Sequence, residues 1–230
     1  MQFASSSVRT QPVTLTKNTE SQVYFLFTLA MAMTLLGVMG GLVFAPFLLG
    51  SGVQVLFVIA ELLLIITARA WINSQPLNLI LFIVFPMLSG ITVAPYILLV
   101  LTGIANGPAI LLNALVATVF MTASAAVASR ALPSLAGFGR VLLIALIGLL
   151  VMGLLQLFIP ALRSTGMELL ISGLGILLFS GFIAYDLQRI AAMGKVGANP
   201  FLMALSLYLD IFNLFLSILR FMVALSGNRK

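Results

Sequence analysis

Seven long apolar segments occupy almost the whole chain, and each is about the length of a transmembrane helix. The hydrocarbon core of a bilayer takes about 20 residues of α-helix to cross. A helix satisfies its own backbone hydrogen bonds in lipid, and the alternating pattern of a membrane β-barrel is absent. The sequence therefore predicts an all-α membrane protein built as a seven-transmembrane-helix bundle. The predicted segments are residues 23–49, 53–71, 77–101, 109–129, 141–159, 168–190 and 200–225.

Composition leaves no room for a second, water-soluble domain. Hydrophobic residues make up 62% of the 230 residues and charged residues only 7%, against about a quarter in soluble domains. We expect one transmembrane domain at 23–226, a disordered cytoplasmic tail at 1–22 and a basic tail at 227–230. Cys and His are absent, so thiolate and imidazole metal ligands are excluded and no cofactor is expected.

The basic residues are scattered singly and do not form a cluster. The formal net charge is +6, and most of the basic residues fall in the N-terminal tail and in alternate loops, including Arg9, Lys17, Arg130, Arg140 and Lys195. This distribution favours contact with the lipid bilayer and no binding of nucleic acid. By the positive-inside rule the N-terminus is predicted in the cytoplasm, and the short loops indicate a multi-pass protein of a bacterial inner membrane.

Two aspartates lie inside the last two apolar segments, where a charged group is costly. Asp186 falls in LLFSGFIAYDLQRI and Asp210 in LMALSLYLDIFNLF. The linker between these helices is short, so they are antiparallel neighbours, and both acids fall roughly 10–15 Å from the same end. We expect the two carboxyl groups to meet and share one proton, because like charges in a low dielectric do not both ionise cheaply. An open pair would offer oxygen ligands for transient Ca²⁺ binding.

Each aspartate could instead be satisfied separately. Arg189 is three residues after Asp186 and lies on the same helix face. Asn213 is one turn after Asp210 and could donate a hydrogen bond to it. The sequence leaves both interpretations open.

Glu61 is a third acid at membrane depth, in the middle of the second predicted segment. An intramembrane acid is by default a candidate for an ion pathway. It could line the same polar path as the aspartates, or it could meet Arg69 two turns further along.

The motifs around the aspartates resemble those of the Bax inhibitor-1 family, and of its bacterial members in particular. The run FIAYDLQRI is similar to the motif around the sixth-helix aspartate of that family, and MALSLYLDIFNLFLSILRF is similar to its last helix. The likeness covers the hydrophobic part in the number and order of segments and is most specific near the C-terminus. The matching positions are Tyr185, Asp186, Gln188, Tyr208, Asp210, Asn213, Phe215, Leu219 and Arg220.

The resemblance implies a seven-helix bundle with the last helix near the centre and a pH-sensitive Ca²⁺ leak across the membrane. In that case Asp186 and Asp210 are the pH sensor and gate, Glu61 occupies the place of the family's second-helix acid, and Ca²⁺ is the permeant ion. Bacterial members carry a basic residue at the place held here by Ile72, so either Arg69, one turn earlier, substitutes for it or this component is missing. A monomer and no enzymatic activity are expected.

An intramembrane aspartyl protease is one competing function. Such enzymes have a Tyr-Asp motif on one helix and a Gly-x-Gly-Asp motif on the next. Tyr185 and Asp186 fit the first motif, but no glycine precedes Asp210 in LYLD.

A non-conducting membrane partner is the other competing function. Some bacterial relatives act with a membrane-bound ATP-dependent protease in stress responses, as substrate or modulator, and the N-terminal tail could form that contact.

Overall fold

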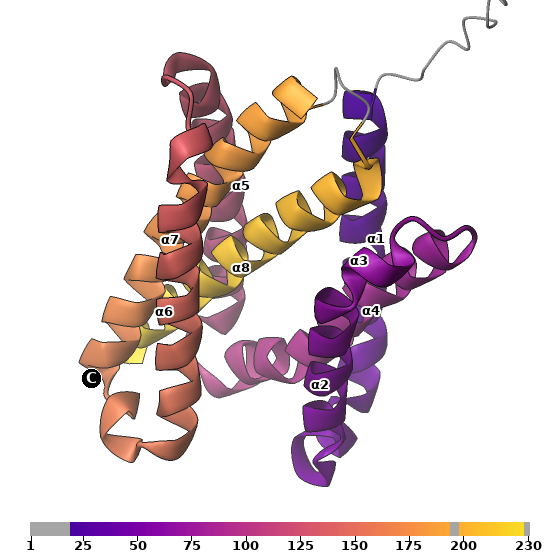
Figure 1. The fold of residues 1–230 in the computed structure, drawn as a ribbon. Coiled ribbons are helices and arrows are strands. Elements are labelled where there is room, and N and C mark those ends of the chain that lie inside the picture. Colours follow the sequence, from indigo (N-terminus) through magenta and orange to yellow (C-terminus); the bar gives the residue numbers. More distant parts are fainter. Residues whose placement is uncertain (1–18, 194–197, 228–230) are drawn as a thin grey trace, which may run out of the picture.

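The computed structural model describes residues 19–193 and 198–227, and the regular structure in this part of the chain is helical throughout (Figure 1). The predicted all-α fold is therefore confirmed at this level. The helices are α1 Thr19–Ser51, α2 Val53–Ile66, α3 Ala68–Trp71, α4 Leu77–Gly103, α5 Gly107–Ala131, α6 Gly139–Phe158, α7 Thr165–Met193 and α8 Pro200–Gly227, with the 3-10 turns η1 Ala136–Phe138 and η2 Pro160–Arg163.

Six of these helices are long and apolar enough to cross a membrane, namely α1, α4, α5, α6, α7 and α8. Many large apolar side chains point outward from them, as expected where lipid is the solvent. The described part of α1 begins at Thr19, within the tail predicted at 1–22. Most of that tail, and residues 228–230 of the predicted basic tail, lie outside the described residues.

The predicted second segment, 53–71, is not one continuous helix. It divides at Thr67 into α2, which has 14 residues and falls short of a full span, and the one-turn α3. The Thr67 hydroxyl donates to the Leu63 carbonyl (2.6 Å), and the indole of buried Trp71 donates to the Leu64 carbonyl (3.1 Å). These bonds hold the chain in a turn where periodicity alone predicts continued helix.

Close backbone contact joins α1 to α4. A Cβ added to Gly37 would collide with the backbone carbonyl of Met87, and one added to Gly90 would collide with that of Thr34. Only glycine allows this approach, in which small residues let two helices pack tightly. The small residues of α1 are not all used in this way, because nothing lies within 4 Å of the position of a Cβ on Gly40.

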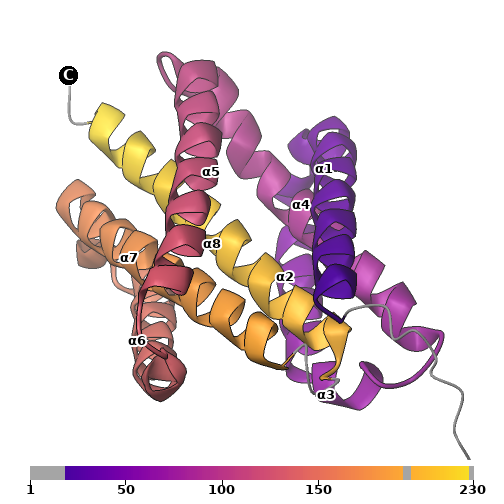
Figure 2. The same cartoon turned by 90° about the horizontal axis from the view of Figure 1, so that it is seen from above.

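The last helix, α8, is the most buried of the six candidate spans. Buried residues make up 61% of its most apolar stretch, whereas the corresponding stretch at α6 contains none. It packs against α7, α1, α5 and α4, and in the view from above it runs between α7 and the α1–α4 pair (Figure 2). Side chains on α8 therefore contact both halves of the bundle, one formed around α7 and the other around the α1–α4 pair.

Candidate functional site

Asp186 on α7 and Asp210 on α8 lie side by side within the packed α7–α8 pair. They are 3% and 8% exposed, and their carboxyl groups are close enough to interact with each other. One oxygen of each, Oδ2, is fully buried and has no hydrogen-bond partner among the described residues. A buried oxygen without a donor is costly, so the arrangement favours a proton between the two carboxyl groups over two separate charges.

The separate partners considered for the aspartates are weak or absent. The nearest guanidinium nitrogen of Arg189 is 3.9 Å from Oδ1 of Asp186, and the Arg189 side chain is 33% exposed. The Ser206 hydroxyl is a further hydrogen-bond partner of Asp186. The Asn213 amide donates to the Leu209 carbonyl (2.8 Å) and makes no hydrogen bond with Asp210. Arg189 therefore makes only a long ion-pair contact with Asp186, and Asn213 makes no contact with the aspartates through its amide.

Tyr208 faces away from the aspartates, although it is only two residues from Asp210. Its side chain is completely buried, and its hydroxyl lies 2.7 Å from the hydroxyl of Thr34 on α1. Its ring stacks on Phe212 and meets the edge of Phe85 on α4. The tyrosine thus fixes α8 against α1 and α4, while Asp210 faces α7.

Glu61 on α2 lies in a separate polar cluster with α4. It accepts hydrogen bonds from the hydroxyls of Ser89 (3.0 Å) and Thr92, and it meets neither the aspartates nor Arg69. Ser89 also interacts with the hydroxyl of Tyr208. The result is a line of polar groups from α2 through α4 to α8.

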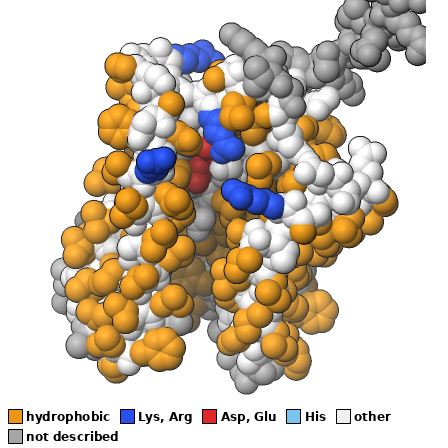
Figure 3. All heavy atoms as spheres, viewed as in Figure 1, with side chains coloured by type: hydrophobic (Ala, Val, Ile, Leu, Met, Phe, Trp, Pro, Cys, Tyr) orange, Lys and Arg blue, Asp and Glu red, His pale blue; other side chains and the backbone are white. Residues whose placement is uncertain are grey.

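Arg69, Ile72 and Tyr185 form no hydrogen bond or salt bridge with the aspartates or with Glu61 in the described part of the chain. Arg69 is exposed on α3 and forms no salt bridge with the described residues, while Ile72 is buried. Tyr185 is half-buried, with its ring over Gly139. In the space-filling view, acidic side-chain atoms lie in a hollow between the two halves of the molecule, with basic side chains around them (Figure 3).

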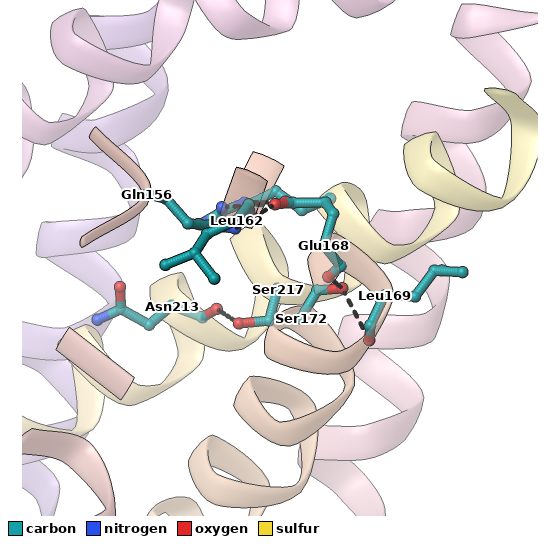
Figure 4. Close-up of polar contacts among 8 residues, drawn as sticks. Gln156, Leu162, Glu168, Leu169, Ser172, Asn213 and Ser217 are labelled. Atoms are coloured by element: carbon teal, nitrogen blue, oxygen red, sulfur yellow. Dashed lines mark hydrogen bonds and ion pairs between the residues drawn. The ribbon is translucent and has the colours of Figure 1, made fainter. Parts of the chain in front are cut away.

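A second charged pair joins α7 and α8 nearer the opposite end, and sequence reasoning missed it. The Arg220 guanidinium donates to both carboxylate oxygens of Glu168, at 2.7 and 3.2 Å. The Gln156 amide of α6 donates to the same carboxylate (3.4 Å) and to the Leu162 carbonyl (2.9 Å) (Figure 4). The antiparallel alignment that pairs the aspartates also indicates this contact, since Glu168 is near the start of α7 and Arg220 is near the end of α8.

The chemistry available at the aspartates is that of oxygen donors alone. Within the described ranges no group of three or more His, Cys, Asp or Glu side chains lies close enough to hold a metal ion. Two carboxylates supply part of a Ca²⁺ shell, which needs six to eight oxygens. Asp186 and Asp210 alone therefore do not complete such a shell.

Known proteins match this chain over most of its helical part. The family profile described as "Inhibitor of apoptosis-promoting Bax1" matches residues 16–228. A Campylobacter jejuni protein is 32% identical over 200 residues, covering 86% of this chain and 84% of its own, and the Escherichia coli protein named "Inner membrane protein YbhL" is 30% identical over 190 residues, covering 75% and 74%. A Helicobacter pylori protein is 36% identical over 149 residues, and the match spans 62% of its length and 64% of this chain.

Proposed function

Because the chain belongs to the Bax inhibitor-1 family of membrane proteins, we propose that it is a pH-sensitive Ca²⁺ leak channel of a bacterial inner membrane. In this proposal Asp186 and Asp210 form the gate, and Ca²⁺ is the ion that passes. The aspartates have no catalytic role. The observation that carries the proposal is the pair of adjacent buried carboxyl groups, each with one oxygen that lacks a donor.

The shared proton gives the pair two states. With one proton the carboxyl groups attract each other through a hydrogen bond between α7 and α8. Without it, two negative charges face each other in a low dielectric, where like charges repel strongly. Loss of the proton therefore pushes the helices apart, and the leak increases as the pH rises through the range in which the pair titrates.

The proposed channel crosses the membrane seven times, with α8 near the centre. Support for the seventh crossing comes from α2, which is short but apolar and packs against α1 and α4 (Figure 1). The central place of α8 is supported by its packing against helices of both halves. An odd number of crossings puts the N-terminus, predicted in the cytoplasm, and the C-terminus on opposite sides. The working unit is a monomer, because the polar line and the aspartate pair lie within one chain.

The proposal is tested with purified protein in liposomes loaded with a Ca²⁺ dye, measured from pH 5 to pH 8. Asp186→Asn and Asp210→Asn replace one acid by a neutral isostere, so we expect the pH dependence of leak to disappear in each. Ser180→Ala, on the same helix, removes a hydroxyl without a hydrogen-bond partner and is the matched control. A leak that varies with pH equally in both aspartate variants and in the wild type would reject the gate.

The same preparation distinguishes the channel from an intramembrane protease. A transmembrane peptide substrate is incubated with wild-type protein and with Asp186→Asn. Cleavage by the wild type that is lost in the variant would favour the enzyme over the channel.

A further inference from the structure

A cavity of about 770 Å³ opens at the end of the bundle where α1 begins and where α5 and α7 end. It is separate from the Glu168–Arg220 cluster and adjoins the aspartate pair through one residue, Arg189. The polar side chains that line it include Glu20, Tyr24, Arg130, Ser134, Tyr185 and Arg189.

Two arginines give this cavity a positive character. Arg130, in the last turn of α5, is exposed and forms no salt bridge within the described part of the chain. Arg189 has only the long 3.9 Å contact with Asp186. The one acid in the lining, Glu20, accepts a hydrogen bond from the hydroxyl of Tyr24 at 3.4 Å. Two guanidinium groups therefore face the cavity with weak or no anionic partners.

The wall of the cavity between the arginines is firmly built. The Gln188 side chain accepts a hydrogen bond from the Leu135 backbone N–H (2.7 Å) and donates to the carbonyls of Ser129 (2.9 Å), Leu132 (3.3 Å) and Pro133 (3.2 Å). It ties the end of α5 and the following turn to α7. The helix ends that carry Arg130 and Arg189 are therefore held next to each other.

We propose that this cavity binds the phosphate of an anionic phospholipid headgroup between Arg130 and Arg189. Guanidinium groups bind phosphate oxygens in a bidentate manner, and basic pockets between transmembrane helices are suited to lipid headgroups. Exposed apolar side chains lie close in sequence to residues that line the cavity, with Phe25 next to Tyr24 and Val127 one turn before Arg130. They offer a surface for acyl chains, which a soluble phosphate compound does not need.

A bound phosphate also competes for a group that the aspartate pair uses. Arg189 lines the cavity and is the cation nearest to Asp186 in the described structure. When its guanidinium turns to a phosphate, Asp186 loses that distant positive charge. The lipid site and the aspartates are therefore linked through one side chain.

Native mass spectrometry of the full-length protein in detergent, titrated with phosphatidylglycerol, tests the site. We expect phosphatidylglycerol to bind more tightly than phosphatidylcholine to the wild type. Arg130→Gln and Arg189→Gln should each weaken phosphatidylglycerol binding about fivefold, since one basic residue near the surface contributes about 1 kcal/mol. The double variant should weaken it about thirtyfold if the two contributions add.

Arg140→Gln is the matched control, because Arg140 is exposed near the start of α6 and does not line the cavity. It should change binding less than twofold. Three results overturn the proposal: equal binding of the two lipids by the wild type, an equal loss in Arg140→Gln, or displacement of the lipid by glycerol phosphate at the same concentration, which would assign the site to a soluble phosphate. The wild-type comparison and the glycerol phosphate competition do not depend on whether any variant folds.

Discussion

The α7–α8 pair carries charged groups towards both of its ends, and the two sets are built in opposite ways. Glu168 and Arg220 have opposite charges, make two hydrogen bonds to each other and receive a third from Gln156. Asp186 and Asp210 have the same charge, and each keeps a buried oxygen without a donor. The Glu168 carboxylate therefore has hydrogen-bond donors to both of its oxygens, whereas the aspartate pair lacks a donor unless a proton lies between the two carboxyl groups.

The two ends of the α7–α8 pair are therefore expected to respond differently to pH. The ion pair of Glu168 and Arg220 holds its end of the two helices together through two hydrogen bonds between opposite charges. At the other end, attraction turns into repulsion when one proton leaves. The helices are therefore expected to separate near the aspartates and to remain joined near Arg220.

Breaking the ion pair between Glu168 and Arg220 should have the largest effect on the stability of the protein. Arg220→Gln leaves the Glu168 carboxylate with Gln156 as its side-chain donor among the described residues. The two side chains are 42% and 26% exposed, so the pair is intermediate between a surface and a buried ion pair. We expect the free energy of unfolding to fall by about 2 kcal/mol, between the values typical of those two classes. Denaturant unfolding in detergent measures the change.

The double variant Glu168→Gln/Arg220→Gln makes this test specific. Removing both charges leaves no unpaired carboxylate, so the double variant should recover part of the stability that Arg220→Gln loses. Arg140→Gln, which removes an exposed arginine that forms no salt bridge with the described residues, should change stability by less than about 0.5 kcal/mol. If Arg140→Gln and Arg220→Gln cost the same, the ion pair does not fasten α7 to α8.

The aspartate end should respond with the opposite sign. Asp210→Asn removes one of two like charges, so once the wild-type pair has lost its shared proton the variant should have a free energy of unfolding higher by about 1 kcal/mol. At lower pH, where the wild-type pair keeps the shared proton, there is no repulsion to relieve and the gain should vanish. Unfolding curves measured from pH 5 to pH 8 test this. A gain of equal size across the whole range would contradict a shared proton.

The elements of this fold could be predicted from the sequence more closely than its side-chain contacts. Apolar length placed a helix at 77–101, where α4 is Leu77–Gly103, and another at 200–225, where α8 is Pro200–Gly227. The break at Thr67 was missed, because it depends on bonds from Thr67 and Trp71 that hydropathy does not contain.

The candidate site was predictable where the chain itself supplies the geometry. A short linker makes α7 and α8 antiparallel, and this placed Asp186 beside Asp210. The placement of Glu61 against Ser89 and Thr92 was not predictable, since it depends on how α2 and α4 are rotated about their axes. The sequence also left open whether Asn213 donates to Asp210, and the structure shows its amide bonded to the Leu209 carbonyl instead.

A change at Glu61 should have the smallest effect, and it tests whether this acid acts separately from the aspartate pair. Glu61 is a single acid, and both of its carboxylate oxygens have hydroxyl donors. Glu61→Gln keeps an acceptor for one of these bonds and removes the charge without relieving any repulsion. If Glu61 attracts Ca²⁺ into the polar line, the variant should lower Ca²⁺ flux about twofold to threefold in the liposome assay, which corresponds to roughly 0.5 kcal/mol. The midpoint of the pH profile should stay where the wild type has it, because the aspartate pair is intact. A shifted midpoint with unchanged maximal flux would place Glu61 in the pH sensor and end the distinction between the two acidic clusters.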